Sequence, residues 1–385
     1  YSSAASDVYK RQVYALAQIP TGILIDKFGP RLLLVVGAVI MGVGQVVLGF
    51  TTSYGVAIAA RVLIGAGDAT AFLSVMRILP YWFPLHRTPM FTQVTSSLGQ
   101  MGQFISAVPF LWLLGAAGWT AAFVTLGAVG ILVAIAAIVA VADSPEKLGI
   151  IATEKEPPNS QATSIPARLK KVFRSPVAWQ AYFIHYIGML PLIIFVMLWG
   201  MPMMTQGMEL SKAKSSLVLT LLAVFLVFVG PLHGKISSRA QHVRPWLSLG
   251  FVVVHVLTWL VFFAFGTDIG LPAILVVSFI TALCTPTANY GFDIVRERMD
   301  RSVVATATGL GNMGGFTSGM LGAQLFGMVL DHSSDAPNYS MPDFTAASTA
   351  VLAVWVVGMV GVVITQFLRR RAGEDGPSVT IVEVS

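Results

Sequence analysis

The chain has 385 residues, of which 55% are hydrophobic and only 11% are charged. Soluble domains carry about 25% charged residues, so this composition excludes a water-soluble globular protein and indicates a surface that faces lipid. A net charge of +6 can signal nucleic-acid binding, but the basic residues lie in alternate connecting segments, and we expect no nucleic-acid partner. The single cysteine, Cys284, excludes a disulfide within one chain.

Long stretches without charge follow one another along the chain. About 20 apolar residues, each rising 1.5 Å, cross a hydrocarbon core of roughly 30 Å. Because backbone groups must be paired inside lipid, we predict helices, and the stretches are too long for transmembrane strands. The predicted helices span residues 13–25, 32–51, 56–79, 88–113, 119–141, 176–200, 213–232, 246–266, 271–290, 303–330 and 345–368.

Polar segments predict the domain organisation. Residues 143–175 are rich in Pro, Ser and Lys, and we interpret them as a cytoplasmic linker between an N-terminal bundle (13–142) and a C-terminal bundle (176–368). Residues 1–12 are polar, lack an initiating Met and do not resemble a signal peptide, so they look like a non-native leader. Residues 369–385 form a polar tail.

The distribution of Lys and Arg predicts the orientation in the membrane. Nineteen of the 24 basic residues lie in or beside alternate loops, whereas the opposite loops hold only Lys212 and Lys214. This asymmetry is typical of the positive-inside rule. It predicts a multi-pass protein of the inner cell membrane, with the C-terminus in the cytoplasm.

An internal repeat relates the two predicted bundles. SLGQMGQFISA (97–107) matches GLGNMGGFTSG (309–319) at an offset of 212 residues. PTGILIDK (20–27) overlays LHGKISSR (232–239) at the same offset, which indicates a duplication. The helix 176–200 has no counterpart in the first copy, so we expect eleven of twelve helices, with helix 1 and part of helix 2 missing.

One loop carries a specific family resemblance. Residues 22–31, GILIDKFGPR, fit the signature G-x-L-x-D-[RK]-x-G-x-[RK] at every fixed position, and residues 61–67, RVLIGAG, are a weaker second match. The sequence resembles the major facilitator superfamily of secondary transporters over residues 13–368. The motifs WFP (82–84), GW (118–119) and NMGGF (312–316) resemble one poorly characterised bacterial branch, which suggests no substrate. The resemblance implies two pseudo-symmetric all-helical bundles that alternate access to a site near the midplane.

The residues of the signature predict a conformational-switch loop. Gly22 allows close helix approach, and Gly29 begins a sharp turn between the basic residues Lys27 and Arg31. Asp26 can accept hydrogen bonds from the unpaired N–H groups of a helix start, and the resemblance implies the helix beginning near Ser302. The second copy keeps the glycine, as Gly234, and one basic residue, as Arg239. Because Ser238 replaces the acid there, we expect a weaker contact.

Charges within the predicted helix 56–79 are candidates for substrate and proton contact. Arg61 and Asp68 lie on one helical face with Gly65 between them. Each costs about 2.5–3.5 kcal/mol at the bilayer centre, so the face is expected to point into a polar interior. Asp68 is the candidate proton carrier. A structural ion pair between the two, or pairing with a missing helix, remains the alternative.

The resemblance implies two further cavity helices. The helix 176–200 offers Tyr182, His185 and Tyr186, although a lone His in such a place is more often a packing residue. The helix 271–290 offers Asn289 and Tyr290, close to Pro286, where freed backbone groups could face a cavity.

No phosphate-binding loop, metal-ligand motif or nucleophile elbow stands in the sequence. We therefore expect no cofactor, no metal and no enzyme. The prediction is a monomeric, proton-coupled secondary transporter of a small polar or anionic organic solute. The alternatives are a multidrug or metabolite efflux antiporter, and a non-transporting membrane sensor or enzyme on the same fold.

Overall fold

The computed structural model describes residues 17–149, 164–333 and 338–373, without the side chains of 103–105 and 107–108. The predicted leader 1–12, residues 150–163 of the linker and the tail beyond Gly373 lie outside the described residues. Regular structure in the described part is helical. After a helix over residues 17–28, the main elements are α2 (Pro30–Phe50), α3 (Tyr54–Trp82), α4 (Thr88–Ala140), α5 (Ile165–Arg174), α6 (Pro176–Leu192), α7 (Gly200–Pro202), α8 (Lys212–Arg239), α9 (Arg244–Val261), α10 (Leu271–Cys284), α11 (Tyr290–Arg298), α12 (Val304–Ser333) and α13 (Met341–Arg371).

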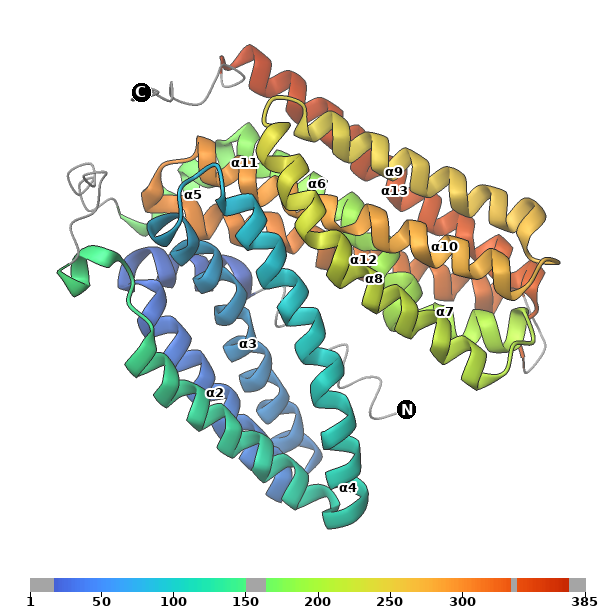
Figure 1. Cartoon of the computed structure of the whole chain (residues 1–385), viewed down its shortest axis with the longest axis horizontal. Helices are drawn as coiled ribbons and strands as arrows, with labels where there is room; N and C mark the ends of the chain where they lie inside the picture. The colour runs from blue at the N-terminus through green and yellow to red at the C-terminus, as the bar shows by residue number, and fades with distance from the viewer. Residues whose placement is uncertain (1–16, 150–163, 334–337, 374–385) are drawn as a thin grey trace. The chain divides into compact units, whose positions relative to one another are not determined.

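The membrane-spanning character is confirmed. Nine helices of the described residues are long and apolar enough to cross a bilayer. The predicted stretches fall on helices from residue 17 onwards. The stretches 88–113 and 119–141 are joined in α4, whose one non-helical residue is Gly118, with φ 80° and ψ −179°. That conformation favours glycine, and the chain turns back on itself there (Figure 1).

The chain separates into two compact units. Unit 1 comprises 1–88, 101–178 and 299–313, and unit 2 comprises 89–100, 179–298 and 314–385. The start of α12 therefore packs with helices of the first sequence repeat, and the start of α4 with helices of the second.

Small residues bring the helices of unit 1 close together. A Cβ built on Gly67 of α3 would lie 2.6 Å from the carbonyl oxygen of Gly37 in α2. A Cβ on Gly130, in the second arm of α4, would lie 2.9 Å from the Cα of Gly42 in α2. Small residues permit such backbone approach inside a membrane. They pack α2 between α3 and the second arm of α4.

Unit 2 contains several irregular helical segments. π-Helical turns at Ile193–Trp199 and Met203–Gly207 continue α6 and α7, and another at Phe262–Gly266 ends α9. A 3₁₀ segment, Thr285–Asn289, joins α10 to α11 at Pro286. The glycine face of α12 packs on α6, because a Cβ on Gly314 would lie 2.1 Å from the carbonyl oxygen of Tyr182. Local departures from α-helical geometry thus concentrate in this unit.

Candidate functional site

The carboxylate of Asp26 is bound to the start of α12. It accepts hydrogen bonds from the backbone N–H of Ala305 at 3.1 Å and of Thr306 at 2.9 Å, and from the Thr306 hydroxyl at 2.7 Å. The first N–H groups of a helix have no partner within the helix, and the helix dipole favours an anion there. The bonds lie at the helix start that the family resemblance implies. They join residues 279 and 280 positions apart along the chain.

A cation supports this carboxylate from α3. Arg77 Nε lies 3.5 Å from Asp26 Oδ1, and the two side chains are 12% and 0% exposed. The Arg77 guanidinium also lies over the ring of Tyr81, 4.9 Å from its centroid. From its position in the sequence, near the end of α3, Arg77 could equally be an anchor at the membrane surface. The ion pair makes it part of the Asp26 contact.

The two glycines of the signature loop have different roles: Gly22 leaves room for a neighbouring helix, and Gly29 adopts a backbone conformation that favours glycine. A Cβ on Gly22 would lie 2.6 Å from the Cα of Thr306, so only glycine admits this approach of α12. Gly29 has φ 89°, a conformation that favours glycine. The next N–H, that of Arg31, donates to Asp143 Oδ1 at 2.7 Å. Lys27 is exposed, and its Nζ lies 5.0 Å from the centroid of the neighbouring phenylalanine ring.

The second repeat reproduces the close approach without the carboxylate. A Cβ on Gly234 would lie 2.5 Å from the Cα of Met90, at the start of α4. Ser238, which stands where the first repeat has its acid, donates instead to the carbonyl of Gly234 within its own helix at 2.9 Å. Arg239 is exposed. The expected difference between the repeats is therefore present in these contacts.

A buried ion pair contacts the start of α4 in place of the carboxylate. Arg296 of α11 donates to the Thr92 hydroxyl at 2.9 Å and pairs with Asp293 at 3.0 Å. Asp293 in turn accepts from Ser237 of α8 at 2.5 Å. The order of the charges is opposite in the two repeats. At the start of α12 the contact is made by an acid that is paired with an arginine, Asp26 with Arg77. At the start of α4 it is made by an arginine that is paired with an acid, Arg296 with Asp293. Sequence reasoning assigned Arg296 to the cytoplasmic loop charge and missed this role.

A second buried ion pair ties α9 to α11. The two terminal guanidinium nitrogens of Arg244 donate to the Glu297 carboxylate, at 2.7 and 2.8 Å, and its Nε donates to the carbonyl of Ser237. Arg244 is fully buried. Such two-point pairing is the strong form of an arginine–carboxylate contact. The DIVRER run at 293–298 was the available signal, because its two acids and two arginines alternate within one helical segment.

An exposed ion pair lies beside the start of α12. Asp300 accepts from the backbone N–H of Ser302 at 2.8 Å and pairs with Lys171 of α5 at 3.1 Å. The hydrogen bond from Ser302, helped by Lys171, lowers the pKa of Asp300 to about 2. This contact attaches the basic helix α5 to unit 1.

The two predicted intramembrane charges lie in unit 1. Arg61 and Asp68 are half-buried residues of α3, which is one of the helices apolar enough to span the bilayer. They lie 7 and 14 residues after the first residue of α3, about 10 and 21 Å along the axis at 1.5 Å per residue. Both therefore belong to the part of the helix that crosses hydrocarbon.

The predicted aromatic cluster of α6 lies in unit 2 and is mostly buried. His185 is within 3.1 Å of the carbonyl of Ala288, and its ring centroid is 4.7 Å from that of Phe292. Tyr186 is 3% exposed. Tyr182 is half-buried and its ring lies 6.0 Å from that of Tyr186. These contacts are those of packing residues for His185 and Tyr186, whereas Tyr182 keeps an accessible surface.

Asn289 and Tyr290 take part in separate buried hydrogen bonds. The Asn289 amide donates to Gln93 at 3.0 Å, and Gln93 donates to the carbonyl of Pro286 at 2.8 Å. The Pro286 carbonyl is thus bonded by a glutamine that the sequence did not single out. The Tyr290 hydroxyl lies 2.8 Å from His233 Nδ1.

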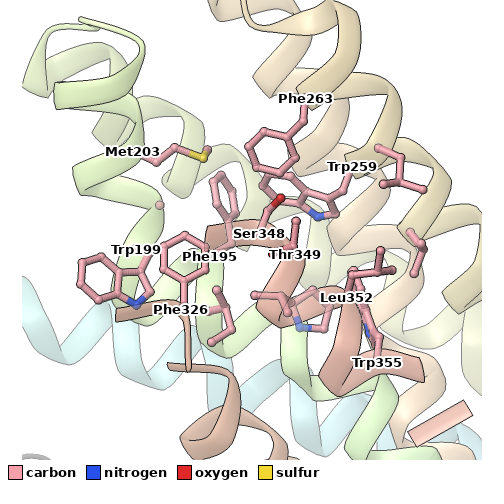
Figure 2. A pocket seen from close by; sticks show the side chains of 16 residues that line it. Phe195, Trp199, Met203, Trp259, Phe263, Phe326, Ser348, Thr349, Leu352 and Trp355 are labelled. Carbon is pink, nitrogen blue, oxygen red and sulfur yellow. The ribbon is translucent and has the colours of Figure 1, made fainter. Parts of the chain in front are cut away.

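An apolar cavity of about 90 Å³ opens in unit 2. Figure 2 shows aromatic side chains around it, among them Trp199, Trp259 and Trp355. Its hydroxyl groups, those of Ser348 and Thr349, donate to carbonyls of their own helix. The lining does not suit a polar or anionic solute. In the described residues no group of three or more His, Cys, Asp or Glu is placed to hold a metal ion.

The comparison with known families identifies the fold. The sequence profile described as the Major Facilitator Superfamily matches residues 13–323. The chain belongs to the major facilitator superfamily. Among solved members, the Escherichia coli fucose:proton symporter superposes with a TM-score of 0.66 over 94% of this chain and 90% of its own, at 14% sequence identity. The predicted two-repeat helical fold is thereby confirmed.

Two curated relatives within the superfamily differ in how much they match. A probable sulfoacetate transporter of Cupriavidus necator is 35% identical over 134 residues, which are 35% of this chain and only 31% of the relative. A putative tartrate transporter of Agrobacterium vitis is 21% identical over 96% of this chain and 85% of its own length. Both names denote transporters of organic acids.

Proposed function

We propose that this protein is a secondary active transporter that carries a small organic acid across the membrane by alternating access, coupled to protons. The observation that carries the proposal is the presence of Arg61 and Asp68 within a helix that crosses hydrocarbon. Charges at such depth are costly and mark solute or proton pathways. An arginine there balances the charge of a carboxylate or sulfonate.

The names of the relatives support an organic acid as the substrate. Sulfoacetate and tartrate, the solutes in those names, are anions at neutral pH. A hexuronate transporter of Bacillus subtilis, 23% identical over 83% of this chain, extends the series to sugar acids. An acidic solute favours the positive charge of Arg61 as its binding partner, with Asp68 as the group that takes up the coupling proton. The fucose:proton symporter has the same fold, which is compatible with proton coupling.

The contact of Asp26 with α12 supports the alternating-access part of the proposal. Two backbone N–H groups and one hydroxyl, all at one helix start, donate to Asp26, so the contact is made or lost as a unit when that start moves. We propose that Gly22, Asp26, Lys27, Gly29 and Arg31 form a switch loop that holds one conformational state. Gly234 and Arg239 mark its weaker counterpart in the second repeat.

Uptake into proteoliposomes tests the function directly. Labelled tartrate, sulfoacetate and glucarate are supplied with and without an inward proton gradient. We expect saturable uptake of at least one acid, accelerated by the gradient. Arg61→Gln abolishes uptake, and the exposed control Arg174→Gln, at the end of α5, retains it. Absence of uptake of every acid under both conditions overturns the proposal.

Exchange experiments separate solute binding from proton coupling. Counterflow of labelled solute against unlabelled solute needs no net proton movement. Asp68→Asn is therefore expected to keep counterflow while losing acceleration by the gradient. Gradient-driven uptake that survives Asp68→Asn removes this residue from the proton pathway.

We also propose that the protein lies in the inner membrane with its C-terminus in the cytoplasm. The supporting observation is the position of basic residues at the ends of two spanning helices. Arg369–Arg371 form the C-terminal end of α13, whereas Lys212 lies at the N-terminal end of α8. The end with more basic residues is expected in the cytoplasm. A fluorescent protein fused after Arg371 is expected to fold and fluoresce, whereas a periplasmic C-terminus leaves it dark.

A further inference from the structure

The apolar cavity of unit 2 lies at the depth of one bilayer leaflet. Ser348 and Trp355 are 7 and 14 residues from the start of α13, about 10 and 21 Å along its axis. Trp199, on the π-helical turn that continues α6, is eight residues from the end of that span at Gly207, a distance of about 12 Å. The cavity therefore runs from the edge of the hydrocarbon core towards its middle.

The cavity is open towards the side that faces lipid. Leu260 of α9 lines it and is 47% exposed, and Thr349 of α13 lines it and is also exposed. α9 and α13 run beside one another (Figure 1). Their exposed surfaces carry further large apolar residues such as Leu257 and Val357. Hydrocarbon is the solvent of such surfaces, so a lipid chain has direct access to the opening.

Irregular backbone shapes the walls of the cavity. The turn Ile193–Trp199 contributes Ile194, Phe195 and Trp199, and the turn Phe262–Gly266 contributes Phe263. π-Helical turns are rare and recur at functional sites. Two of them facing one cavity indicate a built feature of the fold.

One donor in the lining lacks a partner. The indole N–H of Trp199 is buried and donates to no acceptor among the described residues. Its ring stacks on Phe326, 5.4 Å between centroids. By contrast, the indole N–H of Trp355, at the inner end, donates to the carbonyl of Ile187 at 2.9 Å. Tryptophans near the edge of the core commonly meet the polar ends of lipids, and an unpaired buried donor costs about 1–3 kcal/mol.

We propose that the cavity binds one acyl chain of a membrane phospholipid, with the ester carbonyl accepting the hydrogen bond of Trp199. The chain enters between α9 and α13 and runs inward past Phe195 and Leu352 towards Trp355. Apolar cavities of this kind exclude water and accept apolar guests, and the surrounding bilayer supplies the guest at very high local concentration. The site is separate from the proposed acid-binding residues, and it stands whether or not the chain transports an acid.

Photolabelling of the full chain in phosphatidylcholine nanodiscs tests the proposal. A trace of phosphatidylcholine with a diazirine on one acyl chain is added, and labelled positions are mapped by mass spectrometry. We expect labels at Leu352 and Val256 in excess of labels on the exposed residue Leu257. Ser348→Leu fills the cavity and is expected to lower the Leu352 label at least fivefold. Ser216→Leu, on the exposed surface of α8, is the matched control and leaves it unchanged.

Two further arms keep the test decisive. Thr349→Leu blocks the opening from the outside and serves in place of Ser348→Leu if that variant unfolds at a lower temperature than the wild type. Trp199→Phe keeps the ring and removes the donor, and it is expected to lower labelling about threefold. Labelling no greater than at Leu257 overturns the proposal. Equal labelling by a diazirine alkane without a headgroup, together with no effect of Trp199→Phe, identifies a small apolar solute and also overturns it.

Discussion

Replacement of Asp26 by Asn tests how strongly the start of α12 is held. The carboxylate accepts bonds of 3.1, 2.9 and 2.7 Å and faces Arg77 at 3.5 Å. Hydrogen bonds to charged groups contribute about 1.5–3 kcal/mol each. The amide keeps one acceptor oxygen, so at least one backbone N–H of α12 loses its partner and Arg77 loses its counter-charge. We expect a cost of about 3 kcal/mol, which corresponds to a factor of about 100 in the equilibrium of the contact.

The assay compares transport with binding in the same preparation. Because the contact lies away from the proposed solute residues, uptake by Asp26→Asn is expected to fall about 10- to 100-fold while the solute Kd stays within about threefold. The matched control is Asp268→Asn, an exposed acid outside the switch loop, so its uptake stays near wild type. Wild-type uptake by Asp26→Asn would refute the reasoning. An equal fall in the Asp268→Asn variant would show that the assay reports general damage.

Three further changes test packing, burial and protonation in thermal unfolding of the detergent-solubilised protein. Gly22→Ala places a Cβ 2.6 Å from the backbone of α12 and is expected to lower the free energy of unfolding by about 1–3 kcal/mol. The control Gly99→Ala places a Cβ with no atom within 4 Å and is expected to lower it by nothing. Equal decreases in the two variants contradict the close approach. Glu297→Gln leaves the buried guanidinium of Arg244 without its counter-charge and is expected to lower the free energy of unfolding by about 3–5 kcal/mol. A decrease as small as that of the exposed Asp300→Asn contradicts the burial of this ion pair. The pKa of Asp300 falls from 3.8 to about 2 on folding, so its stabilising effect is present above pH 4 and lost as the pH falls towards 2. Asp300→Asn should therefore flatten the pH dependence in that window, and an unchanged profile removes the assignment.

The contact of Asp26 was predictable because its causes are local. A glycine, an acid and a glycine–proline turn at fixed spacing describe a helix end that can receive another helix start. The partner helix, beginning near Ser302, was implied by the family resemblance and not by the residues of the loop. Arg77 was not, because nothing in the sequence around it distinguishes an ion pair from an anchor at the membrane surface.

The ion pairs of unit 2 were missed for the same physical reason. Arg244 and Arg296 follow helix ends, where the positive-inside rule explains any basic residue equally well. Their burial depends on which helices pack beside them, and Glu297 is 53 residues from its partner. The amide of Gln93 is a similar case, since its partners lie 193 and 196 residues away.

The amino-acid sequence by itself determined the membrane-spanning helices, the duplication and the signature loop. These follow from runs of apolar residues, from spacing and from turn chemistry, which act over a few residues. Only the tertiary structure decided the partner of each buried charge, the opposite polarity of the two repeat contacts and the apolar cavity. Those depend on helices distant in sequence, because a buried charge is stabilised by whichever opposite charge packing brings within reach, and a cavity exists only between packed walls.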